Sequence, residues 1–226
     1  MHTGIVVQAR MSSSRLPGKV LRDLCGHPLL EWLLEGLAQS AGAQGIVVAT
    51  SSAPSDDPVE EFCTGKGTPC YRGPLENVAA RMLGAAKEYG MDNLVRVCGD
   101  SPFLDPALVD QAIVLFRQGG ADLVTNVARR TYPKGQSVEV VSREALARAV
   151  DAMTSPEERE HVTKYCYAHP EQFCIRSMES GGHFGAENFC VDTVEDLQSM
   201  TLLANRLCFG SARPGWHELM ALKAGA

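Results

Sequence analysis

Three positive charges are concentrated in one short stretch near the start of the chain, ARMSSSRLPGK at residues 9–19. Arg10 and Arg15 carry guanidinium groups that can bind phosphate oxygens in pairs, and Lys19 adds a point charge. The stretch follows the apolar run GIVVQ, so it is predicted to connect a first strand to a helix, where α/β proteins commonly bind phosphate. Three cations would suit a triphosphate, although a solvated basic loop is the ordinary alternative.

This loop matches neither of the two common glycine-rich phosphate-binding motifs. A Walker A loop would need glycine at Ser13 and a hydroxyl residue at Val20, and the GxGxxG pattern is missing as well. The missing GxGxxG disfavours an NAD-binding dehydrogenase. Side chains, rather than backbone amides alone, are therefore expected to hold the phosphates.

Two acidic residues are candidates for a metal site that would act together with this loop. Asp100, in VRVCGDSPFLDP, and Asp192, in FCVDTVED, each follow an apolar run that is predicted to be a strand. Mg²⁺ binds one or two carboxylates together with phosphate oxygens and water. Asp100 and Asp192 could therefore bridge Mg²⁺ to a triphosphate on the basic loop, as nucleotidyl transfer requires. Alternatively, Asp100 is only a turn residue and Asp192 is only part of the start of a helix.

Four further residues are weaker candidates for contacts with a substrate. Arg72 and Arg81, in YRGPLENVAARM, could reach the site or could form surface ion pairs. His161, in EEREHVTKY, could line an acceptor pocket or serve a structural or interface role. Glu139 alternates with valines in SVEVVS, so in a strand it would lie on the opposite face and could contact a substrate.

Alternating strand and helix patterns are predicted to position these residues. The runs GIVVQA, GIVVAT, NLVRVCG and ADLVT, with a short strand near residue 70, are interleaved with helices predicted near 28–40, 56–65, 75–89 and 106–118. Continuous apolar strands indicate a mainly parallel mixed sheet with helices on both faces, which is a Rossmann-like three-layer α/β architecture. The length and the lack of a low-complexity linker predict one domain over residues 1–226.

The second half of the chain has a different pattern. A strand at SVEVVS precedes helices predicted at SREALARAVDAM and PEEREHVTKYCYAH, and two short strands are predicted near FCIRSM and NFCVDT. Antiparallel strands are expected in this part. A last helix, VEDLQSMTLLANRL, should be capped by Thr193 with Asp196 at its third position, whereas the tail from GSARPGW onward has no clear pattern.

The composition is ordinary for a folded globular protein, with 45% hydrophobic and 21% charged residues. A net charge of -6 argues against sequence-independent binding to nucleic acid or to an anionic membrane, because both need broad basic surfaces. No stretch is typical of a signal peptide or a transmembrane helix, so a cytoplasmic location is expected. Eight cysteines without a CxxC pair predict neither a zinc site nor a disulfide framework.

Taken together, these motifs resemble the cytidylyltransferase family of the spore coat polysaccharide biosynthesis protein F type. They are more distantly similar to the acylneuraminate and 3-deoxy-manno-octulosonate cytidylyltransferases. The matching segments run in family order from residue 5 to about residue 200, and are ARMSSSRLPGKVL, GDSPFLDP, YPKGQSVEVVSREAL, EREHVT and VDTVEDL. The resemblance implies a nucleotide-diphospho-sugar transferase-like fold. It also implies a Mg²⁺-dependent enzyme that transfers CMP from CTP to an acidic sugar or related small acid, with release of pyrophosphate, in polysaccharide or glycoconjugate biosynthesis.

The resemblance also assigns roles to individual residues. It implies that CTP is bound by Ala9, Arg10, Ser14, Arg15, Lys19 and Gly99. It implies a catalytic group of Arg10, Lys19, Asp100 and Asp192, in which the two acids bind Mg²⁺. The segment from about residue 130 to 190 would bind the acceptor and could take part in dimerisation. Family members of this size commonly form homodimers, and the charged, aromatic segment EREHVTKYCYAH is a candidate interface.

Several positions depart from the family pattern. Ser12 replaces a common glycine, and Ser101 replaces a common cysteine. Closer relatives tend to carry an acidic residue at the position of Lys134. They tend to carry Leu-Asp at the positions of Gln136 and Ser137. Asn188 stands where an arginine is common. Two acidic positions have thus become neutral or basic near the expected acceptor, whose charge need not match that in better-known relatives.

Two other functions stay open on this evidence. One is a uridylyl- or guanylyltransferase that acts on a sugar phosphate, because base selection often depends on backbone contacts that a sequence does not reveal. The other is a catalytically silent nucleotide-binding subunit with the same fold. The presence of all four expected catalytic residues argues against a catalytically silent subunit; these residues are Arg10, Lys19, Asp100 and Asp192.

Overall fold

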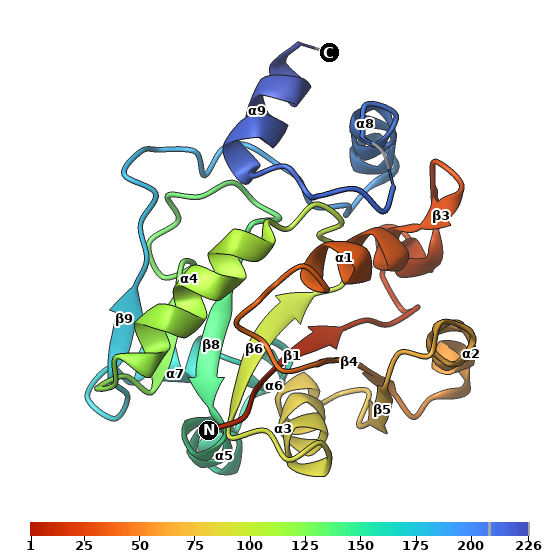
Figure 1. Ribbon diagram of the computed structural model, residues 1–226. Coiled ribbons are helices and arrows are strands. Elements are labelled where there is room, and N and C mark those ends of the chain that lie inside the picture. Colours follow the sequence, from red (N-terminus) through yellow and green to blue (C-terminus); the bar gives the residue numbers. More distant parts are fainter. Residues whose placement is uncertain (208, 226) are drawn as a thin grey trace.

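In the computed structural model, which describes residues 1–207 and 209–225, a seven-stranded sheet has the strand order β5-β4-β1-β6-β8-β7-β9 (Figure 1). Its strands are β1 (Thr3–Gln8), β4 (Ile46–Ser51), β5 (Cys70–Gly73), β6 (Asn93–Cys98), β7 (Leu123–Thr125), β8 (Glu139–Ser142) and β9 (Ile175–Ser177). All neighbouring strands are parallel except β8, which pairs antiparallel with both β6 and β7. The predicted mainly parallel mixed sheet is confirmed.

Helices cover both faces of this sheet because the central strands are apolar on both sides. Along β1, the side chains of Ile5 and Val7 enter one core, and Val6 enters the core on the opposite face. The first core is completed by α1 (Leu29–Leu37), α2 (Asp57–Lys66) and α4 (Pro106–Arg117). The second is completed by α3 (Val78–Glu88), α5 (Arg143–Ala152) and α7 (Lys164–Ala168) (Figure 1). The three-layer α/β domain expected from the sequence is therefore confirmed.

The pairing of β1 with β6 determines where the functional loops lie. These two strands are parallel and in register to their last residues, with Val7 opposite Val97 and Gln8 opposite Cys98. The loop that starts at Ala9 and the turn that starts at Gly99 therefore leave the sheet side by side. A Cβ atom at Gly99 would lie 2.8 Å from the backbone oxygen of Gln8, so this close approach requires glycine.

Two predictions for residues 156–192 are wrong. The single helix expected at PEEREHVTKYCYAH is broken into α6 (Pro156–Glu160) and α7, because Val162 and Thr163 turn inward and are buried between them. The strand expected at NFCVDT is replaced by an extended loop with one isolated bridge, between Lys134 and Asn188. The strand expected at FCIRSM is present as β9.

A third core lies beyond the end of the sheet that carries the functional loops. It is built from α8 (Val194–Ala204), α9 (Trp216–Ala224) and the β2 (Asp23–Leu24) and β3 (His27–Pro28) hairpin, packed around Trp32 and Phe103. Helix α8 begins with the predicted capping box, in which Thr193 and Asp196 exchange hydrogen bonds. The tail from GSARPGW onward, which has no clear sequence pattern, contains the helix α9. Two 3₁₀ turns, η1 (Lys19–Leu21) and η2 (Pro54–Asp56), complete the elements of the described chain.

The cysteines within the described residues carry free thiols, while Cys208 lies outside those residues. None of the helices in the described part of the chain is both long enough and apolar enough to span a membrane.

Candidate active site

A cavity of about 440 Å³ opens at the carboxyl ends of β1 and β6. It brings together every residue that the sequence proposed for nucleotide or metal binding, namely Ala9, Arg10, Ser14, Arg15, Lys19, Gly99, Asp100 and Asp192. Two of the weaker candidates, Arg81 and His161, line it as well. Arg72 and Glu139 do not.

Lys19 lies at the centre of this cavity, between two carboxylates. Its Nζ atom is 2.7 Å from Oδ2 of Asp100 and 2.7 Å from Oδ1 of Asp192. Arg15 approaches the second carboxylate from outside, with Nη2 3.0 Å from Oδ2 of Asp192. Gly18, with a φ of 70°, allows the chain to turn directly before Lys19, because glycine adopts this left-handed conformation without strain.

Backbone contacts fix the two carboxylates, which are distant in sequence. The backbone NH of Val191 donates to the carbonyl oxygen of Asp100 over 2.9 Å, so the loop before α8 is tied to the turn after β6. The NH groups of Asp192 and Thr193 both donate to the carboxylate of Asp196, each over 3.0 Å. The capping box of α8 therefore also orients Asp192.

The charges in this cluster stabilise one another. Burial lowers the pKa of Lys19, but the ion pairs with Asp100 and Asp192 outweigh burial and raise it above its usual value. Burial raises the pKa of Asp192, but its contacts with Lys19 and Arg15 outweigh burial and hold it below its usual value. These two groups are therefore charged at neutral pH.

Arg10 forms a two-pronged ion pair with Glu160, a residue that sequence reasoning missed. The Nη1 and Nη2 atoms of Arg10 lie 3.1 Å and 2.5 Å from the two carboxylate oxygens of Glu160. Glu160 is the last residue of α6 and lines the cavity next to His161. In the sequence, Glu160 directly precedes the candidate His161. Its pairing with Arg10 depends on the packing of α6 against α3, which no local sequence pattern reveals.

Arg81 presents a buried guanidinium to the cavity. The residue is 1% exposed, and its Nη1 atom donates to the carbonyl oxygens of Pro74 and Leu75 over 2.6 Å and 3.3 Å. Its Nε atom is buried without a hydrogen-bond partner, and no carboxylate within the described residues forms an ion pair with it. Burial lowers the pKa of Arg81, and the nearby charge of Arg10 lowers it further.

Arg96, which sequence reasoning also missed, forms part of the cavity wall and is held from behind by Glu139. Its Nη1 atom lies 2.5 Å from Oε2 of Glu139, and its Nε atom donates to Gln8 over 3.2 Å. Glu139 is 1% exposed and also accepts hydrogen bonds from the hydroxyl groups of Thr163 and Tyr167. The structure thus places Glu139 beneath the cavity, where it positions Arg96.

Arg72 lies away from the cavity. Its Nη1 atom is 2.7 Å from Asp57 and 2.8 Å from Glu60, and the rest of its guanidinium donates to the carbonyl oxygens of Ser51 and Ala53. These contacts tie β5 to the segment around the start of α2.

The positions that depart from the family pattern also have structural partners. Gln136 is buried, accepts a hydrogen bond from the NH of Asp105 and donates to the carbonyl oxygen of Phe103. Asn188 donates to the carboxylate of Asp196 over 2.7 Å. Neither side chain lines the cavity.

The two carboxylates fit a metal that arrives with phosphate. Lys19 Nζ marks a point that both Asp100 and Asp192 reach, so a cation is already favoured there. Among residues 1–207 and 209–225, no cluster of three or more His, Cys, Asp or Glu side chains could hold a metal alone. Mg²⁺ needs only one or two carboxylates when phosphate oxygens and water complete its shell.

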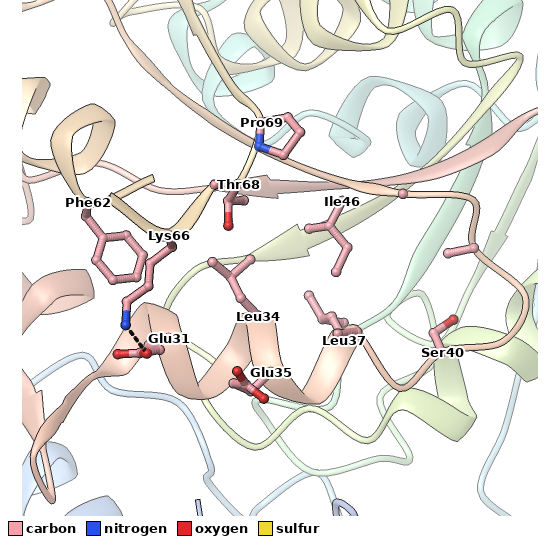
Figure 2. Close-up of a pocket in the computed structure, with 14 residues that line it drawn as sticks. Glu31, Leu34, Glu35, Leu37, Ser40, Ile46, Phe62, Lys66, Thr68 and Pro69 are labelled. Carbon is pink, nitrogen blue, oxygen red and sulfur yellow. Dashed lines mark hydrogen bonds and ion pairs between the residues drawn. The ribbon is translucent and has the colours of Figure 1, made fainter. Parts of the chain in front are cut away.

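A second cavity, of about 430 Å³, lies between α1 and α2, away from the predicted residues (Figure 2). Leu34, Leu37, Ile46 and Phe62 supply its apolar wall. At its rim, Lys66 forms an ion pair with Glu31.

Known proteins resemble this chain in both sequence and fold. The chain is 34% identical over 206 residues to the spore coat polysaccharide biosynthesis protein SpsF of Bacillus subtilis, covering 88% of this chain and 84% of that protein. It is 27% identical to a 3-deoxy-manno-octulosonate cytidylyltransferase of Vesicomyosocius okutanii, covering 90% and 86% of the two chains. A solved cytidylyltransferase structure from Leptospira borgpetersenii superposes with a TM-score of 0.93 at 29% identity, covering 100% of this chain and 94% of that one.

More distant solved nucleotidyltransferases share the fold, which confirms the expected nucleotide-diphospho-sugar transferase-like architecture. The sequence model of the cytidylyltransferase family matches residues 4–210. That range includes the basic loop, both carboxylates of the cavity and the seven strands of the sheet apart from Thr3, the first residue of β1. The chain therefore belongs to the cytidylyltransferase family, and it is a nucleotidyltransferase.

Proposed function

We propose that this enzyme transfers CMP from CTP to an acidic sugar or a related small acid, in a Mg²⁺-dependent reaction that releases pyrophosphate. The observation that carries the proposal is the convergence of Lys19 and Arg15 with Asp100 and Asp192 in one cavity at the strand ends. Cations for phosphate and carboxylates for a metal are the two components that nucleotidyl transfer needs.

Asp100 and Asp192 are the proposed metal ligands. When bound, Mg²⁺ would neutralise negative charge on the phosphate oxygens. With a metal at the two carboxylates, Lys19 and Arg15 would lose their present partners and be available to the triphosphate. In the absence of nucleotide, the two positive and two negative side chains neutralise one another. In its presence, the same four side chains would bind the triphosphate and the metal.

The chain's own cations position the reaction. Arg10, Arg15 and Lys19 would hold the triphosphate so that an acceptor oxygen attacks the α-phosphorus in line. The new bond joins that oxygen to phosphorus, the bond to the β-phosphate breaks, and pyrophosphate leaves with the electron pair. Catalysis comes from orientation and from cations that stabilise charge on the leaving group. Ala9, Gly99 and Ser14 line the same cavity, and we propose that the backbone of the first two and the hydroxyl of Ser14 contact the nucleotide.

The acceptor is proposed to bind where His161 and the buried Arg81 line the cavity, within reach of the segment from about 130 to 190. The positive charge of Arg81 favours an acidic group. The 3-deoxy-manno-octulosonate cytidylyltransferase relative is named for an acidic sugar, and the SpsF relative for polysaccharide biosynthesis. Both names support the proposed substrate class and pathway.

Homodimer formation stays a prediction. Part of the expected interface segment, EREHVTKYCYAH, is used within the subunit, because Tyr165 and Cys166 are buried in the core beneath α3 and α5. Within that segment the exposed residues are His161 and Ala168, and these are left for a partner.

Thermal unfolding with CTP, UTP, GTP or ATP, each with and without Mg²⁺, tests nucleotide and metal together. A ligand at 100 times its Kd stabilises the native state by about 2.7 kcal/mol, which is readily measured. We expect the largest shift with CTP and Mg²⁺, and its loss in Asp100→Asn. Asp151→Asn is the matched control, because Asp151 is exposed on α5 and lies outside the cavity.

Pyrophosphate release with CTP and a panel of acidic sugars, including 3-deoxy-manno-octulosonate, then tests the acceptor. A larger shift with UTP or GTP would overturn the assigned base. Release with neutral sugars or sugar phosphates alone would overturn the assigned acceptor.

A further inference from the structure

The Arg10–Glu160 ion pair uses the edge of the guanidinium by which arginine binds phosphate. Both Nη atoms of Arg10 contact carboxylate oxygens of Glu160, at 3.1 Å and 2.5 Å. Two parallel contacts of this kind are also how a guanidinium grips two phosphate oxygens. Glu160 therefore stands where an anionic ligand of Arg10 would bind, and the two cannot occupy this edge together.

Exchange of this partner would cost little. The side chains of Arg10 and Glu160 are 32% and 36% exposed, and ion pairs at this level of exposure contribute little to stability because water can replace either partner. Arg81 lines the same cavity as Glu160 and forms no ion pair with a carboxylate of the described chain, so positive charge stays in the cavity wall when Arg10 changes partner.

The helix that carries Glu160 is short and buries none of its residues. Helix α6 has five residues, none of which is buried, and it is fixed at its start by a capping box between Ser155 and Glu158. The core resumes only at Val162 and Thr163. The end of α6 could therefore shift without unpacking the core, and His161, which lines the cavity, would shift with it.

From these contacts we infer that Glu160 is a positioning residue that holds Arg10 while no nucleotide is bound and yields it to a phosphate group of CTP. The release of Glu160 moves the end of α6, so nucleotide binding reshapes the wall of the cavity that carries His161. This inference rests on the proposed function, which places the triphosphate on Arg10.

Calorimetric titration with CTP and Mg²⁺ tests the competition directly. We expect Glu160→Gln to bind CTP more tightly than the unmodified protein, by up to about fivefold, the upper limit set by an exposed ion pair. Cytidine, which has no phosphate, should bind both proteins equally. In an Arg10→Met background, where no guanidinium remains to be released, Glu160→Gln should give no gain.

Glu157→Gln is the matched control. Glu157 lies on the same helix and pairs with Lys164 outside the cavity, so its loss removes the same charge without releasing Arg10. The expected result is an unchanged affinity for CTP. A gain equal to that of Glu160→Gln would mean that net charge alone sets the affinity, which overturns the inference.

The remaining outcomes separate this inference from the proposed function. Weaker or equal CTP binding by Glu160→Gln, with normal binding by the unmodified protein, overturns the competition and leaves the proposed function standing. A gain that persists in the Arg10→Met background overturns it as well. Failure of the unmodified protein to bind CTP overturns the proposed function, and the inference with it.

Discussion

Two clusters of charge border the same cavity and differ in how firmly their carboxylates are held. Asp100 and Asp192 have side chains 22% and 36% exposed and share Lys19 between them. Glu139 is 1% exposed and accepts hydrogen bonds from Arg96, Thr163 and Tyr167. A partly exposed carboxylate can change partners at low cost, whereas a buried one with several donors cannot. The first cluster is suited to exchange with a ligand, and the second to fixing the wall that the ligand meets.

The largest expected effect is on stability and comes from the buried cluster. Glu139→Ala removes the ion-pair partner of Arg96 and should lower the free energy of unfolding by about 3–5 kcal/mol. Urea denaturation measures this loss. The control is Glu144→Ala, because Glu144 is 87% exposed and its pair with Arg148 should contribute less than about 1 kcal/mol. Equal losses in the two variants would break the distinction between the clusters.

Substitutions in the cluster of Lys19, Asp100 and Asp192, here called the exchangeable cluster, should change ligand binding more than stability. Lys19→Met removes a charge-assisted contact to phosphate and should weaken CTP binding about ten- to hundredfold. Calorimetry in the presence of Mg²⁺ measures it. Lys66→Met is the matched control, since Lys66 also pairs with a carboxylate, that of Glu31, but outside this cavity. If Lys19→Met bound CTP normally while unfolding as easily as Glu139→Ala, Lys19 would be structural.

A smaller effect is expected where the exchangeable cluster is anchored. Thr193→Ala removes the side-chain cap of α8 and should cost about 1 kcal/mol of stability. Thr193→Ser, which keeps the hydroxyl, should restore most of it in the same denaturation experiment. No loss in the alanine variant would show that the Thr193 side chain does not stabilise this anchor.

The smallest expected effect depends on pH. Burial raises the pKa of Asp192, but Lys19 and Arg15 lower it more, so the folded-state value lies below the usual 3.8. Asp192 therefore contributes stability above about pH 4, and this contribution is lost as the pH falls through its folded-state value. The difference in unfolding free energy between the unmodified protein and Asp192→Asn should be under about 1 kcal/mol at pH 7 and should shrink as the pH falls below about 4. A difference that grew on acidification would have the wrong sign.

The gathering of the basic loop and Asp100 could be predicted because it follows from strand ends alone. Parallel strands bring their carboxyl ends to one edge, so a basic loop after β1 and an acid after β6 must lie close together. The same rule cannot place Asp192, which follows an extended loop rather than a strand. Its position depends on long-range contacts, such as the hydrogen bond from Val191 to Asp100 and the ion pair with Lys19.

The errors and omissions arise where tertiary contacts decide the structure. Residues 156–168 have a continuous helical pattern, but burial of Val162 and hydrogen bonding of Thr163 to Glu139 interrupt it. Alternation in SVEVVS correctly separated Glu139 from its valine neighbours. It could not show that Arg96 stands between Glu139 and the cavity, because the register of β6 with β8 is a property of the sheet. Contact of Glu139 with a substrate stays a prediction.

The link between Asp100 and the loop before α8 also has a consequence for how the enzyme is made. Protein synthesis proceeds from the N-terminus, so the basic loop and the first carboxylate leave the ribosome long before Asp192 does. Helix α8, whose cap orients Asp192, emerges later still. A partly translated chain can build the central strands around β1 but lacks the second carboxylate of the cluster. Newly made protein therefore cannot complete the proposed nucleotide site until the start of α8 has been synthesised.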